Sequence, residues 1–394
     1  MLTAAITDVV RTRGRLAGSS AAVGARAPFN AVEQAVDALA SEPGLVLFFP
    51  TGVRDPQEAA IQARAAAGDA RVAGMTGSGA ITIGGPIEEG CSAIAFDSSL
   101  SFGVGTSMSS DPRSAGRSAA AAALVDVDLD GRPPALLLFV DSESGDQAEI
   151  VAGAYEVAGG RVPLAGGAAG GRVRAQFAEG DAFSGGVVAV ALAGRASIGV
   201  GIAHGCVARG APSIVTRSEG PTVLQLDGRP AETVYLEKIG IDDWALSDAE
   251  FEAIAMAHPL AQPEVRGGFR PRYVRARTPD GGLVCATSIE ANAAVDVCEQ
   301  KPEAIVLSAQ TAVNDVLRQL SGPAEAALVF DCAARSEWFG NPLASWEIAA
   351  IVSSFGDPAP ALAGAYTRGE IGRIRGAKGD RNYSLVVVAL SGLS

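Results

Sequence analysis

Three short runs of continuously apolar residues recur along the chain, and each lies between two stretches with helical periodicity. Apolar runs of this length, without polar alternation, are typical of strands buried on both faces of a sheet. Their alternation with helices predicts an α/β fold of mixed β-sheets flanked by helices. The runs are 45–49, 135–140 and 326–330, with helices expected at 29–40, 111–124 and 310–320 before them and at 55–67, 144–155 and 343–355 after them.

A glycine-spaced pattern follows each of these runs. It reads Ala-Gly, four residues, Gly, any residue, then Ile or Val, and it occurs at 73–81, 165–173 and 363–371. Another apolar run closes each pattern, as in 385–390. Self-similarity of this kind predicts three units built in the order strand, helix, glycine loop, strand. We expect the strand of the third unit to continue through Asp331 to Arg335.

The chain has 394 residues, which is more than one typical hydrophobic core holds, so two domains are expected. The repeated order of strand, helix and glycine loop stops between residues 205 and 220, which places a domain boundary there. We therefore expect a lead-in segment over 1–24, an N-terminal domain over 25–219 and a C-terminal domain over 220–394. Within the last, Ser247 and Glu250 have the spacing of a helix capping box.

The net charge of −13 argues against a nucleic-acid partner, because phosphate binding requires a concentrated basic face. The nearest candidate is an arginine-rich segment, and its alternation with apolar residues predicts the solvent-facing side of a strand. The arginines of this segment are Arg266, Arg270, Arg272, Arg275 and Arg277. No apolar run of 18 residues occurs, so no membrane insertion is expected.

The chain has five widely spaced cysteines and no CxxC pair. An odd number without paired spacing predicts neither a disulfide framework nor a zinc site. No apolar segment of signal-peptide type follows the early arginines. These features together predict a protein of the reducing cytoplasm.

The glycine loops allow two interpretations. Glycine lets a ligand approach backbone amides closely, and loops at the ends of strands can line one crevice. Alternatively, the glycines only make tight turns. No loop matches a phosphate-binding P-loop or GxGxxG, so nucleotide binding is not expected. The loop residues predicted to contact a ligand are Gly74, Thr76, Ser78, Gly167, Tyr366 and Arg368.

Four side chains outside the glycines carry the remaining candidate chemistry, and three of them, Arg335, Glu370 and Cys332, are also predicted ligand contacts. Arg335 can hold a carboxylate with two parallel hydrogen bonds, with Glu370 beside it, or the two can form an internal salt bridge. Cys332 is either a nucleophile or a small buried residue. His204 is the candidate for a haem ligand.

These features together resemble the FIST family, in both its N-terminal and its C-terminal halves. The resemblance covers about residues 25–390, and its most specific parts are Phe-x-Cys-x-x-Arg and Gly-Glu-Ile in the second half. It is carried by 45–49, 74–79, 166–169, 205–206, 226–230, 327–332 with Arg335, and 369–371. One departure is Arg381-Asn382, where the family commonly has His-Asn. Any role of that histidine is not carried over, whereas Asn382 is kept as a predicted ligand contact that orders the loop.

The resemblance implies a sensory domain that binds small molecules such as amino acids, and a subset of the family looks like haem-containing nitric-oxide sensors. The first hypothesis is therefore a stand-alone sensor without a bound cofactor, which takes an amino acid or another small carboxylate and acts through a partner signalling protein. The second is a haem protein that uses His204. The third is a hydrolase or transferase that depends on Cys332.

Overall fold

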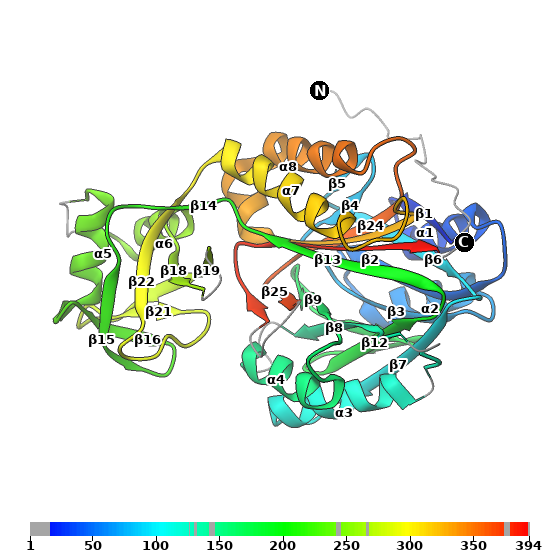
Figure 1. Cartoon of the computed structure of the whole chain (residues 1–394), viewed down its shortest axis with the longest axis horizontal. Helices are drawn as coiled ribbons and strands as arrows, with labels where there is room; N and C mark the ends of the chain where they lie inside the picture. The colour runs from blue at the N-terminus through cyan, green and yellow to red at the C-terminus, as the bar shows by residue number, and fades with distance from the viewer. Residues whose placement is uncertain are drawn as a thin grey trace.

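The protein forms two lobes in the computed structural model (Figure 1). The structure describes residues 16–392 except 126, 130–131, 142–145, 242–245, 265–267 and 374–378. The larger lobe holds three six-stranded sheets, and the smaller lobe holds one nine-stranded sheet. All four sheets carry helices, and the sheets of the larger lobe are mixed, so the predicted α/β class is confirmed.

The three sheets of the larger lobe share one strand order, in which the third and fourth strands are parallel and all other neighbours are antiparallel. The first sheet runs β1 (Ala17–Ala22), β6 (Gly90–Asp97), β2 (Pro43–Thr51), β3 (Arg71–Met75), β10 (Gln176–Ala178), β11 (Asp181–Phe183). The second runs β7 (Ser101–Ser107), β12 (Val187–Ala193), β8 (Ala135–Asp141), β9 (Leu164–Ala169), β25 (Glu370–Arg373), β26 (Asp380–Arg381). The third runs β13 (Ala196–Ala203), β27 (Leu385–Gly392), β23 (Ala326–Cys332), β24 (Ala361–Thr367), β4 (Ala80–Thr82), β5 (Gly85–Ile87).

The last two strands of each sheet come from a different part of the chain. The hairpin β4–β5, which follows the first sheet's β3, completes the third sheet by pairing with β24. The hairpin β10–β11 completes the first sheet, and β25–β26 completes the second. Because each sheet needs a hairpin from a neighbour, the three units cannot assemble independently.

An apolar core fills the space where the three sheets face one another. At its centre lie Phe49, Phe139 and Phe330, which occupy corresponding positions on β2, β8 and β23 and have no solvent exposure. Their ring centroids are 5.8–6.0 Å apart in all three pairs. We call these residues the phenylalanine triad. Tilted and edge-on ring contacts of this kind add to the stabilisation from burial alone.

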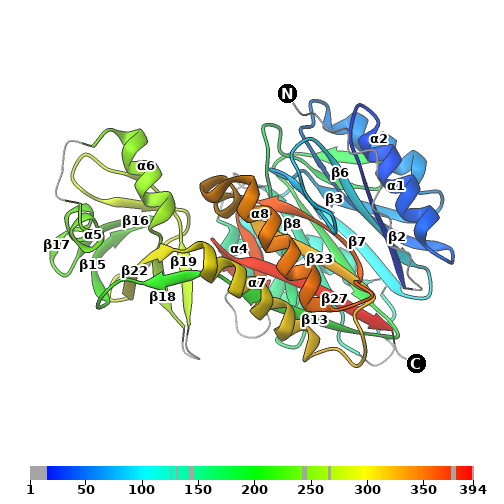
Figure 2. The same cartoon turned by 90° about the horizontal axis from the view of Figure 1, so that it is seen from above.

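Two helices cover the outer face of each sheet and enclose three further cores. Figure 2 shows α7 and α8 side by side on the third sheet. Small residues predominate on the buried faces, as in α3, whose buried residues are four alanines and Gly116, so helix and strand backbones approach closely. The helices are α1 (Ala27–Ala38), α2 (Pro56–Ala66), α3 (Pro112–Val125), α4 (Gln147–Ala158), α7 (Pro302–Leu317) and α8 (Ala333–Phe355).

The first glycine of each loop pattern lies inside a strand, not in a turn. Gly74, Gly166 and Gly364 pair with the residue that precedes a triad phenylalanine in the parallel neighbouring strand. A Cβ atom at these positions would lie 1.9–2.1 Å from the carbonyl oxygen of that neighbour. These glycines are therefore required by the spacing of the strands.

The smaller lobe is inserted between β13 and α7. Its sheet comprises β14 (Cys206–Ala208), β15 (Ser213–Glu219), β16 (Thr222–Leu226), β17 (Arg229–Pro230), β18 (Leu260–Pro263), β19 (Phe269–Arg272), β20 (Val274–Arg277), β21 (Leu283–Cys285) and β22 (Ala294–Gln300). Its helices are α5 (Ala231–Ile239) and α6 (Asp248–Ala257), and Ser247 and Glu250 form the predicted capping box. The expected boundary at residue 220 falls in the turn between the paired strands β15 and β16. The division into an N-terminal domain over 25–219 and a C-terminal domain over 220–394 stays a prediction.

Two local predictions are wrong. The third apolar run ends at Cys332, and Ala333 begins α8, so Arg335 lies on a helix and not on a strand. Arg270 and Arg272 are buried, not solvent-facing, because Asp380 and Gln262 bind their guanidinium groups. Arg266 and the first 15 residues lie outside the described part. No helix in that part is long and apolar enough to cross a membrane.

Replacement of Gly74 by alanine tests the close strand approach. The new methyl group would lie 1.9 Å from the carbonyl oxygen of Phe48, so Gly74→Ala is expected to lower the free energy of unfolding by about 1–3 kcal/mol or more. The matched control is Gly160→Ala, whose nearest neighbour is the Tyr155 hydroxyl at 3.9 Å. Urea unfolding followed by circular dichroism measures both, and equal midpoints for the two variants would contradict the interpretation.

Candidate functional site

The three glycine loops meet at one end of the larger lobe and are joined by backbone hydrogen bonds. Each loop bonds to both others: Ser78 N to Tyr366 O at 2.9 Å, Gly170 N to Thr76 O at 2.9 Å, and Ala168 N to Gly369 O at 2.7 Å. Strands of three sheets thus end at one place. The hydrogen bonds tie the loops to one another, and the hollows described below open beside this junction.

Several residues that were predicted to contact a ligand instead stabilise this junction of the loops. Thr76 is buried, and its Oγ1 accepts a hydrogen bond from Ala175 N at 3.0 Å. Gly167 pairs with Glu370 in the second sheet, where a Cβ would lie 2.7 Å from Thr367 Cγ2. Gly74 lies inside a strand. The packing and hydrogen bonds of Gly74, Thr76 and Gly167 therefore explain why these residue types occur here without a ligand.

Ser78 and Tyr366 line a hollow of about 440 Å³ beside the junction, which we call the loop pocket. Its other walls come from the segment 86–88 and from the first half of α8. Arg368 lies at its edge, because its Nη2 bonds to Oε1 of the lining residue Glu337 at 2.7 Å. The structure therefore brings together three of the predicted residues around one open space.

Arg335 lies in the protein interior and is already paired. It is 1% exposed, and its guanidinium contacts the carboxylates of Asp331 and Glu347. Ser308 Oγ and Tyr383 O accept further hydrogen bonds from it. The structure therefore supports the internal salt bridge, but with Asp331 and Glu347 as partners in place of Glu370, and it leaves no exposed face of Arg335 for a ligand.

Glu370 is a separate buried carboxyl group beside this ion cluster. Its Oε1 accepts a hydrogen bond from Thr367 Oγ1 at 3.0 Å, and its Oε2 accepts one from Ser384 N at 3.1 Å. Burial raises its pKa to about 8, against an ordinary value of 4.5. Burial also raises the pKa of Asp331 and Glu347. Asp331 and Glu347 thus share Arg335 while Glu370 lies nearby, and protonation relieves the excess negative charge.

Cys332 does not have the surroundings of a nucleophile. It is buried, and burial raises the pKa of its thiol well above the usual value, with Glu370 and Asp331 adding to the effect. A thiolate is the reactive form, and negative neighbours oppose it.

His204 does not have the surroundings of a haem ligand. Its Nδ1 accepts a hydrogen bond from Cys206 N at 3.2 Å, and its ring lies 6.5 Å from that of Phe269. Burial, followed by the positive charges of Arg335 and Arg381, lowers its pKa to about 4. The ring also has a hydrogen bond with the Phe269 backbone, so the imidazole is engaged by protein groups and does not fit an iron ligand as it stands.

Asn382 and its neighbours join the two lobes. Its Oδ1 accepts a hydrogen bond from Tyr273 N at 3.3 Å, and Asp380 bonds to Arg272 at 2.8 Å. Arg381 pairs with Glu264 at 2.8 Å. The expected ordering role of Asn382 thus corresponds to contacts that hold the inserted lobe.

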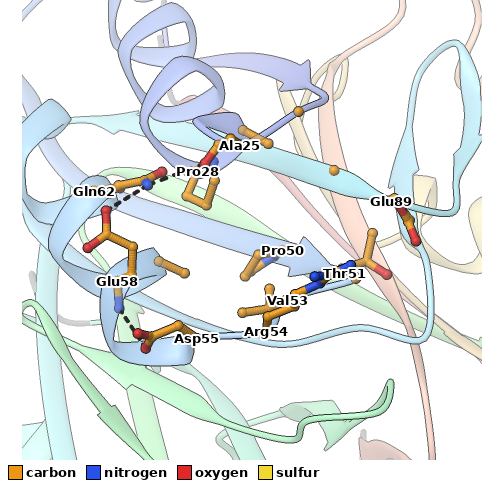
Figure 3. A pocket seen from close by; sticks show the side chains of 15 residues that line it. Ala25, Pro28, Pro50, Thr51, Val53, Arg54, Asp55, Glu58, Gln62 and Glu89 are labelled. Atoms are coloured by element: carbon orange, nitrogen blue, oxygen red, sulfur yellow. Dashed lines mark hydrogen bonds between the residues drawn. The ribbon is translucent and has the colours of Figure 1, made fainter.

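A second hollow of about 440 Å³ opens at the carboxyl end of β2, between the first turns of α1 and α2, and we call it the strand-end cleft (Figure 3). Glu58 and Gln62 stand on one side, joined by a hydrogen bond of 2.9 Å, and Glu89 stands on the other. An adjoining hollow of about 360 Å³ shares Arg54 and Glu89 with it and adds Arg172. Among the described residues, no ion pair engages Arg54, Arg172 or Glu89.

Arg54 corresponds to Arg335 in position. Each lies five residues after a triad phenylalanine, Phe49 or Phe330, near the end of a strand in the same place in its sheet. In the first unit the chain passes directly from β1 to α1, and Arg54 stays exposed. In the third unit the smaller lobe is inserted at the corresponding point, after β13, and Arg335 is buried. Equal spacing from the two phenylalanines is the signal that could have identified Arg54.

Comparison with known proteins gives two family matches and two relatives. The model of the FIST N domain matches residues 44–229, and that of the FIST C domain matches residues 231–373. Two uncharacterised proteins of Mycobacterium tuberculosis, from strains CDC 1551 / Oshkosh and ATCC 25618 / H37Rv, are each 28% identical over 226 residues. The matched region covers 55% of this chain and 57% of each relative, so the chain spans little more than half the length of those proteins.

The buried Glu370 predicts a pH-dependent stability. Between pH 4.5 and 8 the folded protein holds a proton on Glu370 that the unfolded chain releases. This group therefore lowers the free energy of unfolding as pH rises through that window, by up to about 1.4 kcal/mol per pH unit. Glu370→Gln should gain stability relative to the unmodified protein over the same window. Urea unfolding at a series of pH values measures this, and a difference independent of pH would contradict it.

The cysteines predict a protein that is inert to thiol reagents while it is folded. All five are buried. We expect no reaction with a chromogenic disulfide reagent under native conditions and reaction of five thiols in guanidinium chloride. A single fast-reacting thiol in the native protein, lost in Cys332→Ser, would instead support a nucleophile.

Proposed function

This chain belongs to the FIST family, and from that premise we propose that it is a sensory protein that binds a small ligand in the strand-end cleft. The proposed ligand is an amino acid or another small carboxylate. The observation that carries the proposal is the pair of opposite charges in the cleft: Arg54 and Glu89 both line it, and neither has an ion-pair partner among the described residues.

The charges match the two ends of an amino acid. Arg54 and Arg172 can bind a carboxylate with paired hydrogen bonds, and arginine is the side chain best suited to that task. Glu89 and Glu58 can accept hydrogen bonds from an ammonium group. A volume of about 440 Å³ lies within the range of small-molecule sites.

The place of the cleft in the fold also supports a ligand site. Ligands of α/β proteins commonly bind beyond the carboxyl ends of parallel strands, where helices begin. β2 and β3 are such a parallel pair, and α2 begins at the edge of the cleft with Asp55 as its cap. Arg335 is the alternative anchor that the sequence suggested, but two buried carboxylates already neutralise it.

We further propose that the sensor acts in the cytoplasm through a partner signalling protein. All five cysteines are unbridged, which fits a reducing compartment. The helices α7 and α8 expose Leu307 and Trp346, which are 62% and 63% accessible, and large apolar side chains of this kind are typical of protein contacts.

A ligand screen by thermal unfolding tests the proposed site. Binding at about 100 times the dissociation constant contributes about 2.7 kcal/mol and should raise the melting temperature by several degrees. Arg54→Gln should weaken that ligand by about 10-fold or more, because it loses a charge-assisted contact. The matched control is Arg195→Gln, at an exposed position in the turn between β12 and β13.

Two results would contradict the proposal. One is the absence of any stabilisation by amino acids and small carboxylates. The other is a ligand whose affinity is the same in Arg54→Gln and in the unmodified protein. Glu89→Gln adds a check on the ammonium end, since it should weaken amino acids but not carboxylates that lack an amine.

A further inference from the structure

The strand-end cleft and its adjoining hollow are two parts of one trough. The segment 52–54 and Glu89 line both parts. Gly52 has φ 69°, and a Cβ atom there would lie 3.0 Å from Cγ of Glu89, so the glycine makes room for the Glu89 side chain where the two parts meet. We call the joined space the charged trough. It is longer than either hollow alone and can hold a ligand with an extended side chain.

Charged side chains of both signs follow one another along the trough. Glu58, in the first turn of α2, lines only the cleft, and Arg172 lines only the adjoining hollow. Arg54 and Glu89 line both and therefore stand in the middle part. All four side chains are exposed, and no ion pair engages any of them within the described part of the chain. The trough thus has a negative end, a middle with both signs and a positive end.

Hydrogen bonds hold the carboxylate at the negative end in position. Glu58 Oε1 accepts a hydrogen bond from Gln62 Nε2 at 2.9 Å, and the same amide group donates to Ala25 O at 3.4 Å. The neighbouring Asp55 is already engaged as the cap of α2, because it accepts a hydrogen bond from Glu58 N at 3.2 Å. Figure 3 shows Glu58 and Gln62 across the cleft from Glu89, so each of the two glutamates calls for a cationic group of its own.

Apolar groups line the trough between these charges. Pro28, Pro50 and Ala59 line the cleft, and Val53 lines both parts of the trough. The methylene groups of a long side chain can pack against this surface. A side chain that ends in a carboxylate would instead bring a second negative charge towards Glu58, which is unfavourable. The walls therefore favour an extended side chain with a positive end.

We propose that the charged trough selects basic amino acids, in which a second cationic group ends an extended side chain. The α-carboxylate binds Arg54 and Arg172. The α-ammonium group binds Glu89, and the cation at the end of the side chain binds Glu58. This inference rests on the proposed function, because it names the class of amino acid that the same site takes. Each charge of the ligand then meets a charge of opposite sign.

Isothermal titration with L-lysine and L-norleucine tests the selection, because the two share one carbon chain and only lysine has a terminal ammonium group. Lysine should bind about 5-fold or more tightly than norleucine, since it adds a charge-assisted contact at a partly exposed carboxylate. L-Glutamate should bind more weakly than either. The advantage of lysine over norleucine should decrease as salt is added, because salt screens the added contact.

The variant Glu58→Gln separates the terminal cation from the rest of the ligand. Glutamine keeps an acceptor for Gln62 Nε2, so the local fold should persist. The variant should bind lysine no more tightly than norleucine, with the affinity for norleucine unchanged. The matched control is Glu33→Gln, at an exposed position of α1 that lines neither part of the trough. It changes the net charge of the protein by the same amount and should leave the preference for lysine intact.

The outcomes distinguish this inference from the proposed function. Equal affinity for lysine and norleucine, or tighter binding of glutamate, overturns the selection of basic amino acids and leaves the amino-acid site itself in place. A preference for lysine that survives in Glu58→Gln, or that is also lost in Glu33→Gln, overturns the assignment of the terminal cation to Glu58. Absence of binding by all three amino acids contradicts the proposed function, and the inference with it.

Discussion

The phenylalanine triad is the contact on which the larger lobe depends. Phe49, Phe139 and Phe330 meet where three sheets face one another, and each sits on the strand that lies between an antiparallel and a parallel neighbour. This contact sets the position of three strand ends, and the glycine beside each one sets the spacing to the next strand. The glycine loops meet because the strands that precede them end close together. The hairpins β4–β5, β10–β11 and β25–β26 then link each sheet to a neighbouring one. The junction is thus a consequence of core packing, and it supplies a rigid base beside which hollows can form.

Corresponding strand ends serve different purposes in this fold. In the first unit the end of β2 opens to solvent, and within the described part of the chain no ion pair engages Arg54 or Glu89. In the third unit the inserted lobe is held by Arg272, Arg381 and Asn382, and the arginine at the corresponding place is enclosed with the carboxylates of Asp331 and Glu347. An enclosed charge must be neutralised by the protein itself, whereas an exposed one can be neutralised by a ligand. One sequence pattern therefore yields a buried ion cluster at one site and an open cleft at the other.

Much of the fold could be predicted from the sequence because the apolar runs and glycine spacing are local signals. The strands at 45–49, 135–140 and 326–330 and the capping box of Ser247 and Glu250 are present. The exchange of hairpins could not be predicted, since pairing between distant strands leaves no periodic trace. The start of α8 was missed because Gly340 and Pro342 interrupt the helical pattern. Among the site residues, Ser78, Tyr366 and Arg368 gather at one pocket. The enclosure of Arg335 could not be predicted, because its partners come from α7, from the second half of α8 and from residue 383, and such distant pairing leaves no local signal.

The two hollows share a wall, which makes them physically coupled. Glu88 lines the loop pocket and Glu89 lines the strand-end cleft, on the bend between β5 and β6. Thr51, at the end of β2, donates a hydrogen bond to the Glu88 carbonyl at 2.9 Å, and Asn341 of α8 bonds to the Glu88 side chain. A displacement of this bend at one hollow would therefore also displace a lining residue of the other. The same bend reaches α8, whose exposed Trp346 lies one residue before the buried Glu347. The bend is thus tied by hydrogen bonds both to the end of β2 and to α8, so it connects the cleft to a helix of the third sheet.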